Sequence, residues 1–537
     1  MNNQESCADV IASELSASGI RYVFGHPGGE VVDLIEAFSR HDLEFILVGH
    51  ESAAAFMASA IGRMTGTPGV CLSTLGPGAC NLLLGVASAL LDRDPMIAIS
   101  ARSSNSSDTK SQKQNIPLNT IFETAVKWSE PLDGTNTRQT IATAIDIATN
   151  YPRGPVFLTL PNEIAVSSNE NTAGQPEQVG RSKELNERLV ALAKRLNEAK
   201  KPVGIIGMAL NAKDDVSAVR QFFLDTGLPF AVLPQAKGIG DEDAPNFLGT
   251  VASAAGDASI VEFLENSDVI LGVGFDTVES AQSWHFDRTF LSLANGSVGF
   301  KEFQPTIECT GDVGQLMNQL SARYNGSCQW QRSDIEQVRN RVKAEIQPKE
   351  SSGDTGLSPF HVLQSLQAVL PQETIVAVDV GAHKMLTCQV WKSIRPESFL
   401  VSNGMSSMGY GVPSALAASL VNPSRPVIGI VGDGGFGMMV QELETAVRMR
   451  VTPLLVVFCD RSLAVIKVAQ RNRNLPHRGV DFSPVNWAEV ALGFGVKNLW
   501  VSTLDELSKS VGDWLKTPEL TVIAVPIDEN LYEGLTY

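Results

Sequence analysis

The stretch that decides the fold is residues 427–462, VIGIVGDGGFGMMVQELETAVRMRVTPLLVVFCDRS. Two apolar runs in it, VIGIV and LLVVFC, predict buried strands, and the segment 438–450 between them (MMVQELETAVRMR) predicts one helix. A strand–helix–strand unit of this kind places its two strands parallel to each other in one sheet. Asp433 and Asp460, which end the two strands, are therefore expected at the same edge of that sheet.

This edge has the chemistry of a metal and phosphate site. Gly434 and Gly435 let the backbone approach an anion closely, and the amino end of the following helix favours negative charge. Two carboxylates, a backbone carbonyl and phosphate oxygens complete an octahedral shell for Mg²⁺ or Ca²⁺. The alternative from local sequence is that Asp433 caps a helix and Asp460 lies in a surface turn.

Outward from this unit, strand-like and helix-like segments alternate along the whole chain. The pattern predicts an α/β protein of three doubly wound parallel-sheet domains, with ligands outside the carboxyl ends of the strands. Two polar stretches, 167–183 and 346–359, are interpreted as linkers. We therefore expect a first domain at 1–166, a central domain at 184–345 and a last domain at 358–537.

Composition narrows the class of protein. A chain of 537 residues with 43% hydrophobic and 19% charged residues is typical of several globular domains. The net charge of −17 disfavours nucleic acid or an anionic membrane as the main partner. The seven scattered cysteines, without a CxxC pair, indicate neither zinc nor a disulfide framework, and we expect a reduced cytoplasm. No signal peptide or membrane helix is expected from the apolar runs.

The GDG motif, followed by a helix, a strand and a second Asp 27 residues after the first, resembles the metal motif of thiamine-diphosphate enzymes. Most of that family has Asn at the second position; Asp460 is similar to the flavin-independent catabolic acetolactate synthases. The resemblance implies Mg²⁺ held by Asp433, Asp460 and the backbone carbonyl of Ser462. It also implies that Gly434, Gly435, Ser462 and Leu463 contact the cofactor.

Four further segments carry the resemblance. In GHESAAAF, Glu51 resembles the glutamate that protonates N1′ of the pyrimidine; on local grounds it is only a favourable acid at a helix start. FGHPGGE and STLGPGACN, otherwise ordinary Gly/Pro turns, resemble segments near the reaction centre and the pyrimidine. VDVGAHKM and NGMSSMGYG resemble the diphosphate loop and the segment that wedges the cofactor, although a lone His is more often structural. The residues implied are Gly28, Gly29, Pro77, Asn81, Gly381, Ala382, His383, Ser406 and Met408.

The resemblance implies decarboxylation of a 2-oxo acid, expected to be pyruvate, and carboligation to an acceptor, giving 2-acetolactate if that acceptor is a second pyruvate. FAD is not expected, since GFDTVESAQSW (274–284) resembles a flavin-free central domain. Gln114 matches the polar residue that holds the bound intermediate, whereas Lys113 departs from the family pattern and is either a solvated loop charge or a contact for an acidic acceptor.

Alternatives remain for the activity of the chain. Carboxyethylarginine synthase, sulfoacetaldehyde acetyltransferase and 2-hydroxyacyl lyases share the scaffold with a different acceptor. A non-catalytic cofactor-binding homolog is the alternative of another class. In the family, the pyrimidine segment of one subunit faces the diphosphate segment of another, so the resemblance implies a homodimer or homotetramer.

Overall fold

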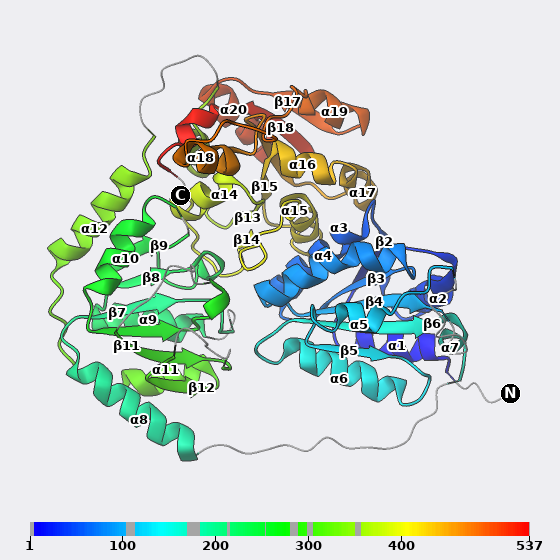
Figure 1. Cartoon of the computed structure of the whole chain (residues 1–537), viewed down its shortest axis with the longest axis horizontal. Coiled ribbons are helices and arrows are strands. Elements are labelled where there is room, and N and C mark those ends of the chain that lie inside the picture. Colours follow the sequence, from blue (N-terminus) through cyan, green and yellow to red (C-terminus); the bar gives the residue numbers. More distant parts are fainter. Residues whose placement is uncertain are drawn as a thin grey trace.

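The computed structural model describes residues 5–103, 113–168, 183–211, 215–252, 254–279, 288–297, 304–348 and 356–535. These residues form three α/β domains, each built on a six-stranded sheet with helices on its faces (Figure 1). The pairing within every sheet is parallel, as the alternating pattern predicts. The fold class expected from the sequence is confirmed.

The first sheet has the strand order β2-β1-β3-β4-β6-β5. Its strands are β1 (Tyr22–His26), β2 (Glu44–Leu47), β3 (Gly69–Ser73), β4 (Met96–Arg102), β5 (Trp128–Pro131) and β6 (Pro155–Pro161). Its helices are α1 (Cys7–Ala17), α2 (Val32–Arg40), α3 (Glu51–Thr65), α4 (Pro77–Asp92), α5 (Leu118–Phe122), α6 (Thr137–Thr149) and α7 (Asn162–Ala165).

The third sheet repeats this topology in the order β14-β13-β15-β16-β18-β17. Its strands are β13 (Ile375–Val378), β14 (Phe399–Val401), β15 (Val427–Gly432), β16 (Leu454–Cys459), β17 (Lys497–Trp500) and β18 (Thr521–Pro526). Its helices are α13 (Pro359–Val369), α14 (Ala382–Val390), α15 (Gly411–Val421), α16 (Asp433–Met439), α17 (Glu442–Met449), α18 (Ala464–Asn472), α19 (Trp487–Gly493) and α20 (Leu504–Lys516). The central strands are buried along their length, which explains their continuous apolar runs.

The middle sheet has the order β12-β11-β10-β7-β8-β9, the doubly wound order of dinucleotide-binding folds. Its strands are β7 (Pro202–Ile206), β8 (Phe230–Val232), β9 (Phe247–Thr250), β10 (Val269–Val273), β11 (Thr289–Ala294) and β12 (Ile307–Thr310). Its helices are α8 (Lys183–Glu198), α9 (Val216–Thr226), α10 (Asp257–Glu265), α11 (Val313–Ser321) and α12 (Arg332–Glu345). Residues 169–182 of the first predicted linker and 349–355 of the second lie outside the described residues.

One hydrophobic core joins the first and third domains. Helix α3, rich in alanine, packs on α15 of the third domain, and the ring of Phe56 meets the ring of Tyr410 edge to face at 5.8 Å. Small side chains on α3 let the two helices approach closely, so this single cluster includes residues of both sheets. The first domain therefore packs against the third (Figure 1). The central domain contacts the first as well, since Arg93 donates to Asp276 at 2.8 Å.

The prediction of one helix over 438–450 is wrong. The helix that follows β15 starts at Asp433 itself, ends at Met439, and is followed after two turn residues by α17. At the break, the N–H groups of Leu443 and Glu444 donate to carbonyls three residues earlier, which is the tighter 3₁₀ pattern. The new helix start directs the buried side chain of Glu442 towards the first domain.

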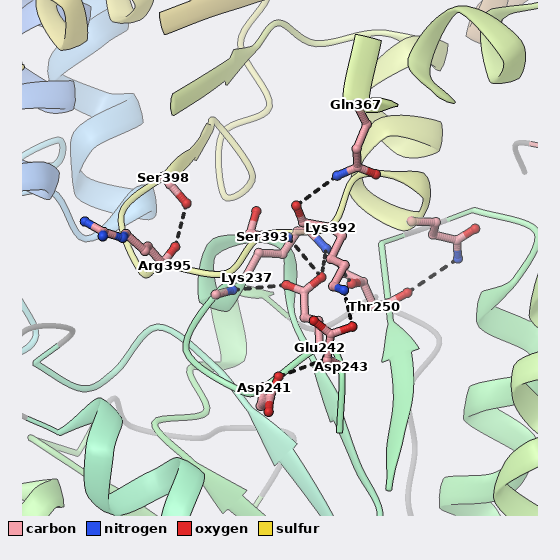
Figure 2. Close-up of polar contacts among 12 residues, drawn as sticks. Lys237, Asp241, Glu242, Asp243, Thr250, Gln367, Lys392, Ser393, Arg395 and Ser398 are labelled. Carbon is pink, nitrogen blue, oxygen red and sulfur yellow. Dashed lines mark hydrogen bonds and ion pairs between the residues drawn. The ribbon is translucent and has the colours of Figure 1, made fainter. Parts of the chain in front are cut away.

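A buried ion pair of the central domain is bonded to the third domain through Glu242. Figure 2 shows Lys237 and Glu242 beside Ser393, which lies between α14 and β14. The Lys237 ammonium is 2.9 Å from the Glu242 carboxylate, which also accepts the backbone N–H of Ser393 at 3.3 Å. Both charged side chains are almost fully buried, so each depends on the other for compensation. This contact fixes the segment that leads into β14.

Candidate active site

A cavity of about 340 Å³ lies at the carboxyl ends of β13, β14, β15 and β16. Its size is within the range of small-molecule and cofactor sites. The residues named from the sequence that line it are Gly381, Ala382, His383, Ser406, Met408, Asp433, Gly434, Gly435, Asp460, Ser462 and Leu463. A larger cavity of about 730 Å³ lies elsewhere, between α9, the segment 395–397 and Arg425, and contains none of these residues.

Asp433 and Asp460 are brought together as the strand–helix–strand unit predicts. Asp433 accepts the backbone N–H groups of Gly434 at 2.8 Å and of Arg461 at 2.7 Å, and Asp460 accepts that of Ser462 at 3.0 Å. Burial raises the pKa of Asp433 to about 6. Burial, reinforced by repulsion from Asp433, raises the pKa of Asp460 to about 8. Two adjacent carboxylates of this kind, Asp433 buried and Asp460 half-buried, are a suitable pair of ligands for a divalent cation.

The start of α14 forms a further part of the cavity lining, beside Gly432. His383 is buried against Gly381 and Gly432, where an added Cβ would lie 2.7 Å and 3.0 Å from its ring carbon. Among the described residues, its Nε2 atom has no hydrogen-bond partner. Burial lowers the pKa of His383 to about 4, so the ring is neutral near pH 7. A buried ring nitrogen without a partner in a cavity wall fits a site that binds a polar ligand.

Asp379 is a residue of this site that the sequence reasoning missed. It is fully buried at the end of β13 and accepts the backbone N–H groups of Val380 at 2.7 Å and Gly409 at 2.9 Å. Burial raises its pKa to about 7, although these N–H groups oppose the shift. Gly435 packs directly on this carboxylate, since a Cβ on Gly435 would lie 2.1 Å from the Asp379 Oδ2 atom. The sequence offered one signal for Asp379: in VDVGAH it directly follows a buried apolar strand, where an acidic side chain needs hydrogen-bond donors.

The segment that carries Ser406 and Met408 is held from the first domain. Asp92, at the end of α4, accepts the Ser402 hydroxyl at 2.8 Å and the backbone N–H groups of Asn403 at 2.9 Å and Gly404 at 2.7 Å. Asp92 is almost fully buried. No motif in the sequence connects Asp92 with this segment, because the two are more than 300 positions apart.

Glu51 lies at the carboxyl end of the first sheet, at the first residue of α3. Its side chain is buried, and its carboxylate accepts the amide of Asn81 at 2.9 Å. Gly78 leaves room for the Glu51 carboxylate, since a Cβ on residue 78 would be 3.0 Å from it. Pro77 is the first residue of α4, the helix that also carries Gly78 and Asn81.

The remaining first-domain residues lie on other loops at strand ends of the same sheet. Gly28 packs on Thr74 of the STLGPG turn, where a Cβ would lie 2.3 Å from the hydroxyl, whereas Gly29 faces open space. Gln114 has φ of 63° and lies next to Gly76 of the same turn. Lys113 is exposed. These residues form a second group of strand-end loops, equivalent in topology to the loops around the cavity.

Among the described residues of one chain, the first-domain group and the cavity group do not meet. Every described residue that lines the 340 Å³ cavity belongs to the third domain, and Glu51 is not among them. Within the described residues, no group of three or more His, Cys, Asp or Glu side chains is placed to hold a metal. A metal at Asp433 and Asp460 would therefore need ligands beyond side chains. No described helix is long and apolar enough to cross a membrane.

Comparison with known proteins finds three domain models that match the chain in the same order as its three sheets. Three thiamine pyrophosphate enzyme models match the chain: the N-terminal TPP-binding domain at residues 5–121, the central domain at 189–320 and the C-terminal TPP-binding domain at 379–525. Acetolactate synthase of Bacillus subtilis (strain 168) is 29% identical over 97% of this chain and 93% of its own length.

Two further relatives cover the chain to the same extent. Catabolic acetolactate synthase of Raoultella terrigena is 27% identical over 97% of this chain and 95% of its own length. Acetolactate synthase isozyme 2 large subunit of Escherichia coli (strain K12) has the same identity and coverage. The similarity thus includes all three sheets and both groups of strand-end loops.

Proposed function

The chain belongs to the thiamine pyrophosphate enzymes, as a thiamine-diphosphate-dependent carboligase or lyase of the acetolactate synthase-like kind, and we propose that it converts two pyruvates into 2-acetolactate and CO₂. The observation that carries the proposal is the cavity that Asp433, Asp460 and His383 line together. When bound there, the cofactor supplies a thiazolium carbon that adds to the 2-oxo group and accepts the electron pair released with CO₂.

The cavity residues have the chemistry to hold the diphosphate and its metal. Asp433 and Asp460 would ligate Mg²⁺, with the carbonyl of Ser462 as a further ligand. Gly434 and Gly435 expose backbone at the start of α16, and the amino end of α14 is directed at the same space. His383 supplies a neutral ring nitrogen without a partner in the described residues. Met408, which also lines the cavity and ends near Gly434, would support the middle of the cofactor.

Glu51 is proposed as the group that exchanges a proton with N1′ of the pyrimidine. Its burial and its bond from Asn81 hold the carboxyl in one position. A buried carboxyl that faces a ring nitrogen can hold the proton between them in a well-defined place, which is what activation of the cofactor requires. Gln114 and Gly28, on the neighbouring loops, would line the space for the substrate.

We propose a homodimer that completes the site. Glu51 and the cavity belong to different groups of loops, so the first domain of one subunit would cover the cavity of another. Large exposed apolar side chains support this: Met405, Met438, Ile466 and Phe482 in the cavity walls or the segments next to them, and Val32, Leu47 and Leu84 near the first-domain loops. Exposed apolar groups concentrated around a site mark a surface for association.

The extent of each domain is part of this proposal, with limits at 1–166, 184–345 and 358–537. Each range contains one of the three sheets, β1–β6, β7–β12 and β13–β18. The limits fall outside all strands, in segments of polar composition, where few contacts are expected to cross.

A second candidate function differs in the acceptor, and the exposed side chain of Lys113 favours it. Lys113 is exposed beside Gln114, so its ammonium is available to a carboxylate or another anionic group on an incoming acceptor. Pyruvate itself has such a carboxylate. An anionic acceptor other than pyruvate would meet the same charge, which makes a related transferase the second candidate.

The test is CO₂ release from pyruvate in the presence of thiamine diphosphate and Mg²⁺, with the products identified by mass spectrometry. We expect 2-acetolactate as the main product, and a decrease of about 10²- to 10⁴-fold in turnover for Glu51→Gln with cofactor binding retained. CO₂ release without 2-acetolactate would favour another acceptor. A chain that binds the cofactor but releases no CO₂ from any 2-oxo acid would be a non-catalytic homolog.

A further inference from the structure

Lys384 is a cationic residue inside the wall of the cavity that the motifs do not assign. It is the third residue of α14, after Ala382 and His383. Its side chain is only 7% exposed, and it lines the same cavity as its two neighbours. A lysine this deeply buried requires a physical reason, since lysine is almost never fully buried without a charged partner.

The described residues contain no carboxylate in direct contact with this ammonium. Its Nζ donates to the carbonyl of Ser402 at 3.0 Å, the hydroxyl of Ser406 at 3.1 Å and the side-chain oxygen of Asn403 at 3.4 Å. All three acceptors are neutral, and all lie on the segment that leads to Met408. The carboxylates of Asp92 and Asp379 act on it only through space.

The charge is therefore only partly compensated by this chain. Burial lowers the pKa of Lys384, which is the sign of an ammonium that has lost its hydration without a full counter-charge. Its three N–H donors are used on neutral acceptors, which hold the segment but add no negative charge. An anion in the cavity next to the start of α14 would supply the missing counter-charge.

We propose that Lys384 is a binding and positioning residue for the diphosphate: its buried ammonium supplies counter-charge to the anionic tail and holds the segment with Ser406 against it. This inference rests on the assignment of the cavity to thiamine diphosphate. It concerns a side chain of this protein and adds no step to the reaction. It predicts that Lys384 contributes to the preference of the site for a doubly phosphorylated tail over a singly phosphorylated one.

The test is the affinity of the Mg²⁺-loaded protein for thiamine diphosphate and for thiamine monophosphate, measured by titration calorimetry. For Lys384→Gln and Lys384→Met we expect the Kd for the diphosphate to rise by about 10- to 100-fold, as for loss of a charged hydrogen-bonding group. The Kd for the monophosphate should rise less. The ratio of the monophosphate Kd to the diphosphate Kd, which measures the preference for the diphosphate, should therefore fall. Lys392→Gln is the control, because Lys392 is a half-exposed lysine paired with Asp243 at the domain contact in Figure 2.

The outcomes separate this inference from the proposed function. If the wild-type protein binds neither compound, the proposed function fails. If the wild type binds and the neutral variants bind the diphosphate as well as it does, or lose both compounds equally, the role of the charge is refuted and the function stands. Lys384→Arg keeps the charge and is read if the neutral variants do not fold: diphosphate affinity within about threefold supports the inference, and a loss of about tenfold or more overturns it.

Discussion

The carboxylate of Glu442 accepts the backbone N–H of Gly49 at 3.1 Å, although 393 positions separate the two residues. Glu442 is fully buried at the start of α17 and also accepts the Thr445 hydroxyl at 2.8 Å. Gly49 lies two residues before Glu51, so this contact from the third domain fixes the loop that delivers the proposed proton-exchanging group.

Replacement of Glu442 by Ala should therefore affect both stability and turnover. The Gly49 N–H loses its acceptor in a partly buried place, which should lower the free energy of unfolding by about 1–3 kcal/mol. Turnover should fall in the folded variant because the loop before Glu51 is less constrained. Urea unfolding and steady-state kinetics measure the two effects. Glu444→Ala is the matched control on the same helix, since Glu444 is exposed and paired only with Arg448; it should change stability by less than about 0.5 kcal/mol.

Replacement of Asp460 should weaken metal-dependent retention of the cofactor. Asp460→Ala removes an anionic ligand, and we expect the Mg²⁺ concentration for half-maximal cofactor binding to rise by at least about tenfold. Asp460→Asn keeps an oxygen ligand, so its Mg²⁺ requirement should lie between those of the wild type and Asp460→Ala. Asp481→Asn alters a nearby exposed carboxylate that pairs with Lys467 and should have no such effect. An unchanged Mg²⁺ requirement in Asp460→Ala would exclude this residue as a ligand.

Addition of a methyl group at Gly435 should be far more harmful than at Gly434. A Cβ at Gly435 would lie 2.1 Å from the fixed carboxylate of Asp379, whereas at Gly434 the nearest atoms, 3.2 Å away, are the ends of Met408 and Phe482. Overpacking against a rigid group costs about 1–3 kcal/mol. Thermal unfolding and cofactor titration of the two Ala variants measure the difference. Equal behaviour of both would contradict the tight contact between Gly435 and Asp379.

Stability should respond to pH through His383. The folded pKa of about 4 lies below the ordinary value of 6.5, so between these values the unfolded chain binds a proton that the folded protein does not. His383 therefore contributes stability above pH 6.5 that is lost as the pH falls towards 4, with a slope of up to about 1.4 kcal/mol per pH unit. Asp379 acts in the opposite direction between its ordinary pKa of 3.8 and about 7.

The contribution of His383 is isolated by comparison with His383→Asn. The stability difference between wild type and variant, from urea unfolding at several pH values, should shrink as the pH falls from 6.5 to 4. A difference that stays constant over this range would mean that His383 is protonated equally in the folded and unfolded states. The measurement is made without cofactor, so it reports on the ring alone.

Flavin should neither co-purify with the protein nor affect its turnover. At the carboxyl end of β7, the Glu279 carboxylate accepts the backbone N–H of Met208 at 2.8 Å, a group that a phosphate would otherwise use. At the end of β10, Asp276 is bonded by Arg93 and by the Tyr151 hydroxyl, each at 2.8 Å. These side chains occupy the strand ends where a dinucleotide binds in sheets of this order. Visible absorbance of flavin in the purified protein would refute this prediction.

The strand ends were predictable because each carries its own signal. An apolar run that stops at Gly-Asp-Gly, His-Pro-Gly-Gly or Val-Gly-Ala-His marks a parallel strand with a loop, and these loops lie at the sheet edges where the pattern places them. The pairing of Asp433 with Asp460 follows from the unit that connects them. The break at 440–441 was not predictable, because good helix-forming residues continue through it and the contact of Glu442 with Gly49 that accompanies it joins two domains.

The sequence by itself determined the three α/β domains, the cofactor family and the residues at each strand end, since periodicity and motif spacing are local properties of the chain. Only the tertiary structure decided which of these residues lie together. Asp92 with Gly404, Glu442 with Gly49 and Lys384 with Ser406 meet because helices and loops of packed domains place them side by side. It also separated Glu51 from the cavity, because hydrophobic packing of α3 on α15 sets the position of the first domain within each chain.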